Sequence, residues 1–239
     1  MAAAGSNSSG TFDFAPTLGD VFINAYGRCQ IRRAAISADH LRDAAMSANL
    51  VQVEWANEQV NLWTVDLQSI PLVPGQDTYD VDPATIMIMA AWIETTYPPD
   101  GRPKDRMLTS IDRDTYAAFP DKTKPGDPTV YWYQSLILPK ITLWEPPDDK
   151  EDRVLKFYRA RQIQDASMPR GLQAEVPYRF LEAYIAALAF KLAELYAPAR
   201  MEELALRAAN TFKNAKERDV EKAPLRIVPA LSTYTSQVY

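Results

Sequence analysis

The prolines and glycines of this chain of 239 residues are distributed very unevenly. None of them interrupts the stretch from Ala38 to Trp63, whereas ten of the eighteen prolines and three of the eight glycines lie between Pro98 and Gly171. An uninterrupted stretch suits a helix, because proline removes a backbone donor and glycine loses the most conformational freedom on ordering. A stretch rich in proline suits turns between short strands. The distribution therefore predicts helices toward the ends of the chain and a β region between them.

Four segments carry apolar residues at the 3.6-residue spacing of one helix face. Gly27 can end the first of them, and Pro198 stops the third. Pro177 suits the first turn of that third helix, because its missing N–H has no partner there in any case. The predicted helices span residues 18–26, 38–63, 177–197 and 200–219.

The middle of the chain contains short runs of β-branched and aromatic residues separated by turn signals. The strand candidates are Ile86–Ile93, Met107–Ile111, Thr129–Tyr133, Leu136–Leu138, Ile141–Trp144 and Val154–Tyr158. One short helix, Arg113–Phe119, interrupts the series. Several short strands without long helices between them predict an antiparallel sheet, folded as a small sandwich or open barrel.

The sequence as a whole predicts the α+β class. We expect an antiparallel helical bundle built from the N- and C-terminal helices, with a small antiparallel β domain inserted between them and an extended C-terminal tail. The expected parts are a flexible leader (1–16), a helical domain (17–70 and 176–221), a β domain (71–175) and a partner-binding tail (222–239).

Composition argues against several functional classes. Cys29 is the only cysteine and His40 the only histidine, so one chain cannot form a disulfide, a thiolate metal cluster or a multi-histidine site. The glycines are scattered, and neither nucleotide-binding fingerprint occurs, so we expect no cofactor and no metal. No run of eighteen apolar residues is present, and the small, polar N-terminus is not a signal peptide. We therefore expect no membrane partner and synthesis in a reducing cytoplasm.

Four features invite a chemical interpretation, and each has a simpler one. His40 is expected to be an ordinary exposed helix residue, and Cys29 to be buried or incidental, although nearby arginines can lower a thiol pKa. The acidic residues between Glu145 and Asp152 surround two prolines and no glycine, so a solvated turn is favoured over a calcium loop. The run Tyr131–Tyr133 has no basic neighbours, so alternating strand packing is favoured over base stacking.

The order of helices, tryptophans, β region and helix pair resembles a known family, the head-to-tail adaptors of tailed bacteriophages. These are also called packaged-DNA stabilisation proteins or tail accessory factors. The resemblance spans about residues 18–220. It is carried by Leu50–Asn57, Leu62–Trp63, Leu72–Val81, Ile111–Tyr116, Pro125–Tyr131, Leu143–Pro147, Glu175–Ala183 and Leu188–Tyr196. The serine-rich leader and the loop Pro98–Lys104 depart from the family pattern.

The resemblance implies a non-enzymatic structural protein at the head–tail junction of the virion. It implies a ring of about twelve copies beneath the portal protein, with helices packed between subunits and the β domain directed toward a tail or nozzle protein. DNA would pass through the channel without specific binding. The net charge of −5 agrees with that, since an acidic protein repels phosphates.

The resemblance also implies that the C-terminal segment inserts along the portal. Ordering residues 224–239 costs on the order of 15–30 kcal/mol, whereas burying their apolar side chains returns at most about 10–20 kcal/mol. We therefore expect the tail to be disordered in the free subunit and ordered on the portal. The portal-binding candidates are Leu225, Ile227, Val228, Leu231, Tyr234, Val238 and Tyr239.

Two alternatives remain open at this point. The chain is a hydrolase of the virion that acts on the cell wall, or it is a binding module or assembly chaperone that never enters the particle. Activity on cell walls would support the first, and absence from purified virions would support the second.

Overall fold

The structure is a computed structural model, and it describes residues 11, 13–58, 62–96, 102–167 and 172–219. Its longer helices are α1 (Leu18–Arg28), α2 (Ala38–Glu58), α4 (Leu181–Tyr196) and α5 (Met201–Lys216), and α3 (Arg113–Ala118) is short. The strands are β1 (Val65–Pro71), β2 (Thr78–Asp80), β3 (Thr85–Thr96), β4 (Pro103–Ser110), β5 (Val130–Gln134), β6 (Lys140–Trp144) and β7 (Asp152–Arg161). The α+β class is confirmed.

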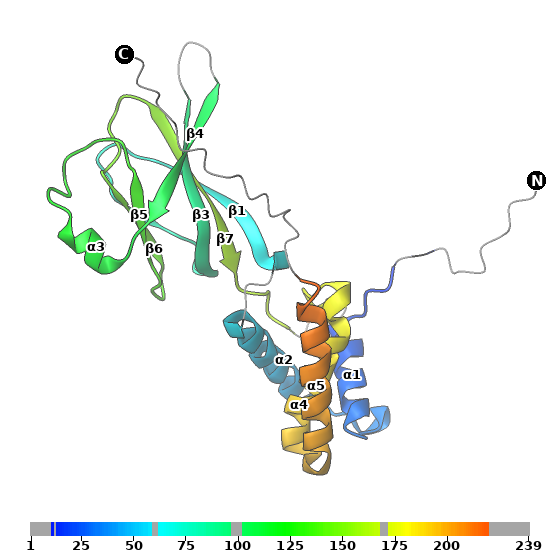
Figure 1. The fold of residues 1–239 in the computed structure, drawn as a ribbon. Helices are drawn as coiled ribbons and strands as arrows, with labels where there is room; N and C mark the ends of the chain where they lie inside the picture. The colour runs from blue at the N-terminus through cyan, green and yellow to red at the C-terminus, as the bar shows by residue number, and fades with distance from the viewer. Residues whose placement is uncertain (1–10, 12, 59–61, 97–101, 168–171, 220–239) are drawn as a thin grey trace, which may run out of the picture.

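Helices α1, α2, α4 and α5 share one hydrophobic core, with α4 in contact with each of the other three. The four helices lie together at one end of the molecule, whereas α3 lies beyond the strands (Figure 1). Alanines of α4, among them Ala186, Ala189 and Ala193, are fully buried, and such small side chains allow close helix packing. Thr17 caps α1 through a reciprocal pair of hydrogen bonds with Asp20, so the start of this helix is determined locally.

The aromatic side chain of Trp55 stands at the centre of the helical core. It stacks on Phe212 at 5.0 Å between ring centroids, and it meets Phe180 and Tyr184 at 5.7 Å each. Trp63 also contacts Phe180, at 4.7 Å, and its indole N–H donates to the Glu175 carbonyl. The two tryptophans therefore connect α2 and the segment after it to the C-terminal helices.

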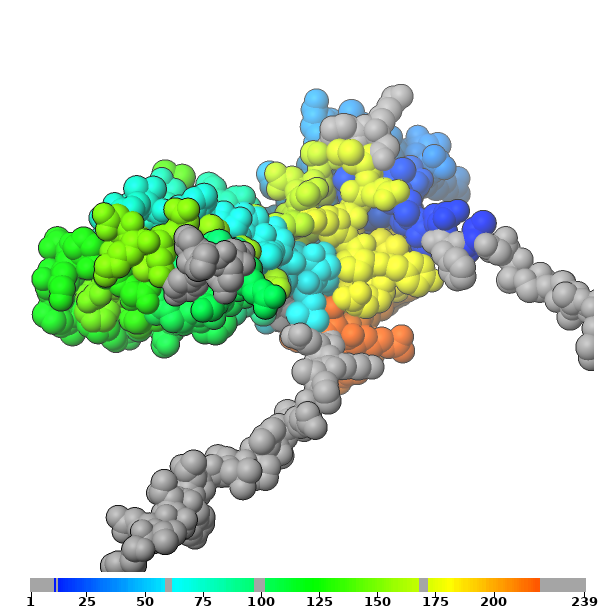
Figure 2. All heavy atoms as spheres, turned by 90° about the horizontal axis from the view of Figure 1, so that it is seen from above, coloured from blue at the N-terminus to red at the C-terminus, as the bar shows by residue number. Residues whose placement is uncertain are grey.

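The strands form one seven-stranded sheet in the order β1-β7-β3-β4-β5-β6-β2, which curls around a second hydrophobic core. Strands β3 and β7 make the most extensive pairing, and β1 joins β7 in antiparallel register. Seen from above, the strands and the helices form two adjoining masses (Figure 2). Residues Ile93, Leu155 and Phe157 of the central strands are buried, and they alternate with residues on the opposite face of the sheet.

Several local expectations are wrong. Strands β4 and β5 run parallel, so the sheet is not purely antiparallel. The predicted strand Leu136–Leu138 is instead the exposed turn between β5 and β6, because the pairing of these strands ends at Gln134 and Lys140.

The expected boundary at residue 70 falls inside β1, which begins at Val65, so the residues before the boundary are not all helical. Helix α2 ends at Glu58 rather than at Trp63. Most of the leader, residues 1–10 and 12, and the tail 222–239 lie outside the described residues. The domain boundaries stay a prediction.

Candidate functional site

All the residues nominated for portal binding lie outside the described part of the chain. They are Leu225, Ile227, Val228, Leu231, Tyr234, Val238 and Tyr239. What the structure describes is the point from which this tail departs, Asp219. Of the site that the sequence predicts, the structure therefore describes only how the residue before the tail is attached to the helices.

The attachment point is held by polar contacts to three parts of the chain. The Asp219 carboxylate is buried and forms an ion pair with Arg179, at the start of the third helical segment. It also accepts from the backbone N–H of Leu62 at 3.4 Å. One turn earlier, Lys216 pairs with Glu58 at the end of α2, at 3.0 Å. The tail thus departs from a fixed position where the helices meet the strands.

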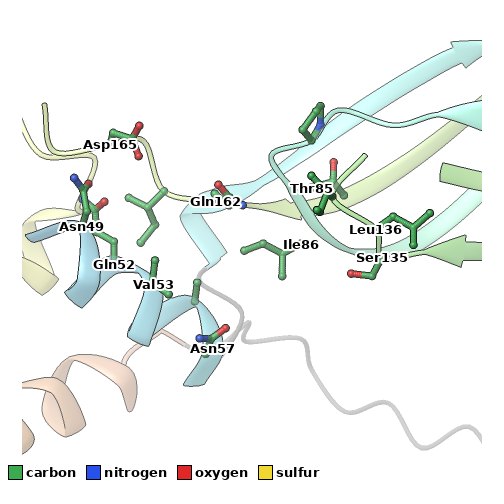
Figure 3. A pocket seen from close by; sticks show the side chains of 14 residues that line it. Asn49, Gln52, Val53, Asn57, Thr85, Ile86, Ser135, Leu136, Gln162 and Asp165 are labelled. Carbon is green, nitrogen blue, oxygen red and sulfur yellow. The ribbon is translucent and has the colours of Figure 1, made fainter. Parts of the chain in front are cut away.

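A cleft lies between α2 and the end of the sheet (Figure 3). Its volume is about 490 Å³. One wall is α2, with Val53 and Asn57, and the other includes Ile86 of β3 and the β5–β6 turn. The cleft is lined by Asn49, Gln52, Val53, Ala56, Asn57, Pro83, Thr85, Ile86, Ser135, Leu136, Ile137, Gln162, Ile163 and Asp165.

Polar side chains of the cleft are used to hold its walls. The Asn49 side-chain oxygen accepts from the backbone N–H of Ala166 at 2.8 Å, which fixes the strand-to-helix connection against α2. The Gln52 amide donates to the Tyr184 hydroxyl at 3.1 Å, and burial raises the pKa of that tyrosine. These two groups are therefore satisfied internally, and the rest of the lining is mixed, with polar residues such as Asn57 and Asp165 beside apolar ones such as Val53 and Ile86.

Large apolar side chains continue from the cleft onto the molecular surface. Met46, Leu50 and Val53 follow one another on the outer face of α2 and are 64%, 50% and 56% exposed. They lie opposite the buried residues Ala44, Ala48 and Val51, so α2 is apolar on two faces. In the β5–β6 turn, Ile137 is 95% exposed. We call Met46, Leu50, Val53, Leu136, Ile137 and Leu138 the cleft surface.

A second apolar surface lies on the outer face of the central strands. Leu67 pairs with Tyr158, and Trp92 pairs with Met107, so these residues cross β1, β7, β3 and β4 on one side of the sheet. The Trp92 and Tyr158 rings are in contact at 5.3 Å between centroids. Met107 is 64% exposed. We call Leu67, Trp92, Met107 and Tyr158 the outer sheet patch.

Two arginines of β7 form an ion-pair network near the cleft. Arg159 is buried and pairs with Asp66 at 2.7 Å and Asp82 at 3.1 Å. Hydrogen bonds from Arg159 hold the pKa of Asp66 below its usual range. Arg161 pairs with Glu175 and likewise lowers the pKa of that carboxyl. Because each guanidinium has acidic partners within the chain, this network joins the sheet to the helical segment instead of presenting a site for anions.

Cys29 and His40 occupy structural positions, as the simpler interpretation predicted, except that His40 is half-buried against Tyr196 and not exposed. The Cys29 thiol is buried against the Ala189 carbonyl, and this burial raises its pKa, contrary to activation by nearby arginines. His40 stacks on Tyr196 at 4.7 Å, and its Nδ1 lies 2.7 Å from the Ser37 hydroxyl at the start of α2. The described contacts of both residues are those of packing and helix capping.

The acidic turn and the aromatic strand also have structural explanations. Arg153 is buried and pairs with Asp148 at 2.6 Å, which lowers the pKa of Asp148 to about 2. Asp148 is therefore less solvated than expected. Tyr131 is buried while Trp132 faces the other side, where it contacts Tyr116 at 5.4 Å, so alternating packing in β5 is confirmed.

Within the described residues, no group of three or more His, Cys, Asp or Glu side chains is arranged to hold a metal ion. In the same part of the chain, no helix combines the length and apolar character that crossing a membrane requires.

The cleft surface and the outer sheet patch were not anticipated from the sequence. Two features of the sequence could have indicated the cleft surface. The α2 segment has apolar residues on a second face, and Leu136–Leu138 is an apolar tripeptide followed directly by Pro139.

Comparison with known proteins gives one finding. A family model described as SU10 adaptor protein matches residues 20–229. No match was found among curated proteins.

Proposed function

The chain belongs to the SU10 adaptor protein family of phage head-to-tail adaptors, and from this membership we propose that its copies form a ring beneath the portal. In this function the ring connects the capsid to the tail and helps to retain packaged DNA. The observation that carries the proposal is the extent of the match, because residues 20–229 include both the helical core and the sheet. The role is structural, and the proposal assigns no catalysis to the chain.

Within this function, we assign the contact with the portal protein to the tail. The attachment at Asp219 supports this, since it gives the tail a fixed origin beside the end of α2. Twenty residues follow Asp219, and a fully extended chain of that length reaches about 70 Å. A contact that is weak for one copy becomes firm when a ring repeats it.

The proposal further assigns the strands to contact with a tail or nozzle protein and leaves DNA unbound in the channel. The net charge of −5 supports passage of DNA through the channel without binding, because fixed negative charge repels each phosphate. An assembled ring with a continuous lining of lysine and arginine would contradict this part.

Mass spectrometry of purified virions tests the location. We expect the chain in every particle, at a ratio to the portal protein that fits one ring per virion. Its absence from washed particles would overturn the proposal and favour an assembly chaperone.

A separate experiment tests the tail. We expect a chain ending at Ala223 to lose binding to isolated portals. A full-length variant with Ile227→Ser, Val228→Ser and Leu231→Ser should lose binding as well, because it keeps the length and charge but removes apolar groups. Hydrogen exchange should show stronger protection of the tail amides on the portal than in the free protein. Equal binding by the shortened and complete chains would refute the assignment.

A further inference from the structure

The seven-stranded sheet has two edge strands, β1 and β2, and β2 is a protected edge. It is three residues long, and only Thr78 and Asp80 direct their backbone groups outward, since the residues beside them bond to β6. The side-chain amide of Gln76 donates to the Thr78 carbonyl at 2.8 Å, and Asp80 is charged and pairs with Lys140 at 3.2 Å. Short length, charge and an occupied acceptor all discourage a further strand from pairing here.

Strand β1 is the longer edge, and most of it is open. The hydrogen bond from the Leu72 N–H to the Arg153 carbonyl, at 2.9 Å, sets the register with β7. Bonded and non-bonded pairs alternate in an antiparallel ladder, so the odd-numbered residues of β1 direct their backbone groups away from β7. Among the described residues, the outward groups within Val65–Ser69 have no hydrogen-bond partner. Pro71 also faces outward, where its missing N–H is not required.

The open edge is suited to an extended segment of polypeptide. Its unpaired groups follow one another at the spacing of a strand, so they match the backbone of another strand. The outward residues Val65, Leu67 and Ser69 are uncharged, and Leu67 is 49% exposed. An uncovered edge of this kind pairs with other chains and promotes aggregation, so a free subunit benefits from a segment that covers it.

The C-terminal tail begins beside this edge. Asp219 accepts from the Leu62 N–H at 3.4 Å, and Leu62 lies three residues before Val65, the first residue of β1. The start of β1 and the end of α5 are accordingly side by side (Figure 1). A segment tethered at this point has a high local concentration at the edge. A portal or tail protein has no such advantage before assembly, so the position of the tail identifies the occupant.

One part of the tail has the composition of a strand and lies within reach. Leu225–Val228 ends in two β-branched residues and contains no glycine. Pro224 precedes it and Pro229 follows it, and proline is tolerated at the ends of a strand but not inside a ladder. From Asp219 the chain needs six residues to arrive at this segment, and an extended stretch of that length reaches about 20 Å. This length is sufficient to place the segment beside Val65–Ser69.

We propose that Leu225–Val228 pairs with the free edge of β1 in the unassembled subunit and leaves it for the portal. The release step rests on the proposed function, because the contact with the portal uses the same apolar residues. Only four residues are held on β1, so most tail amides stay unprotected before assembly and gain protection on the portal. The pairing covers the open edge and part of the apolar tail at the same time.

Disulfide formation in the free protein tests the pairing. Leu67→Cys is combined with one cysteine of the tail, and copper phenanthroline serves as the oxidant. Cys29 is the only native cysteine and is buried, so the introduced pair reports on itself. In the matched control, Met107→Cys replaces Leu67→Cys, because Met107 is 64% exposed but belongs to β4, three strands away from β1. The tail substitutions are Leu225→Cys, Arg226→Cys, Ile227→Cys and Val228→Cys.

Pairing as a strand predicts an alternating pattern. Side chains alternate between the two faces, so the positions that react with Leu67→Cys should be alternate ones and never two adjacent ones. The product should be an intramolecular disulfide whose yield does not change on dilution, and Met107→Cys should give none. No disulfide at any of the four positions, or an equal yield with Met107→Cys, would overturn the pairing. Disulfide-linked dimers from a mixture of the single-cysteine chains would show that the edge takes the tail of a second copy instead.

Binding to isolated portals tests the release. The chain locked by the disulfide should not bind, and reduction with dithiothreitol should restore binding. Equal binding of the locked and reduced chains would overturn the release step. If the disulfide forms but the unaltered protein does not bind portals, the pairing stands, whereas the release and the proposed portal contact fail. If the unaltered protein binds portals but no disulfide forms, the proposed function stands and the pairing with β1 is wrong.

Discussion

Truncation of Trp55 to alanine removes the side chain that joins three helices in one core. The indole is 4% exposed and contacts Phe212, Phe180 and Tyr184. Phe212 belongs to α5 and Tyr184 to α4, so the substitution weakens the attachment of α2 to both C-terminal helices. The cavity cannot close easily, because the surrounding side chains are large, and Phe180 and Tyr184 are fully buried.

The expected cost follows from this burial. Replacing a core Phe or Trp by alanine costs about 3–5 kcal/mol in unfolding free energy. The upper half of that range applies here, since each aromatic pair contributes about 0.5–1.5 kcal/mol beyond burial of area. For a chain of this size, 1 kcal/mol changes the melting temperature by about 2–4 °C, so a cost of about 4–5 kcal/mol should lower the Tm by roughly 8–20 °C.

Thermal unfolding followed by far-ultraviolet circular dichroism measures this change, because the helices give most of the signal. Leu50→Ala is the matched control, being on the same helix but 50% exposed, and it should change the stability by less than about 1 kcal/mol. Equal melting temperatures for the Trp55→Ala and unaltered proteins would refute the central position of this tryptophan.

Two further predictions concern glycine and pH. Gly27→Ala should stabilise the protein by about 0.5–1 kcal/mol, because a Cβ at this helix position meets nothing within 4 Å. Gly126→Ala should be less favourable than Gly27→Ala, because its Cβ would stand 1.7 Å from Oε2 of Glu145, which must rotate away, and 3.2 Å from the Glu145 Cβ; chemical denaturation of both variants checks this order. The hydrogen bond from Arg153 lowers the pKa of Asp148 from 3.8 to about 2. The Arg153–Asp148 pair therefore contributes fully to the free energy of unfolding above pH 3.8, and this contribution is lost as the pH falls from 3.8 toward about 2. Asp148→Asn should therefore lower the free energy of unfolding at neutral pH and make it depend less on pH in the acid range. An unchanged pH dependence in the acid range would contradict the pairing.

The helices were largely predictable because their signals are local. The Thr17–Asp20 capping box lies within four residues, and Pro198 ends α4 through its own geometry. The central strands were also recognisable from β-branched and aromatic runs. Strand β1 was missed because it follows the helical segment without a proline or glycine and carries polar residues such as Asp66 and Gln68. Pairing with β7 and the ion pair from Arg159 stabilise it, and both come from residues far away in the chain.

The candidate site likewise has features that the sequence predicts and features that it does not. The resemblance to head-to-tail adaptors was readable from the sequence, because it depends on motifs and their order, and the family match bears it out. The cleft surface was not readable. Leu136–Leu138 has the composition of a buried strand, and only the end of the β5–β6 pairing leaves it exposed.

The sequence by itself determined the positions of the main helices, the presence of a β region and the family. These properties follow from backbone preferences and apolar spacing within a few turns of chain. The tertiary structure decided the parallel pairing of β4 with β5, the buried partners of Arg153 and Arg159, and which apolar side chains remain uncovered. Burial of a side chain depends on segments that are distant in sequence. The exposure of a residue such as Ile137 is therefore decided only by the packing of all the other elements.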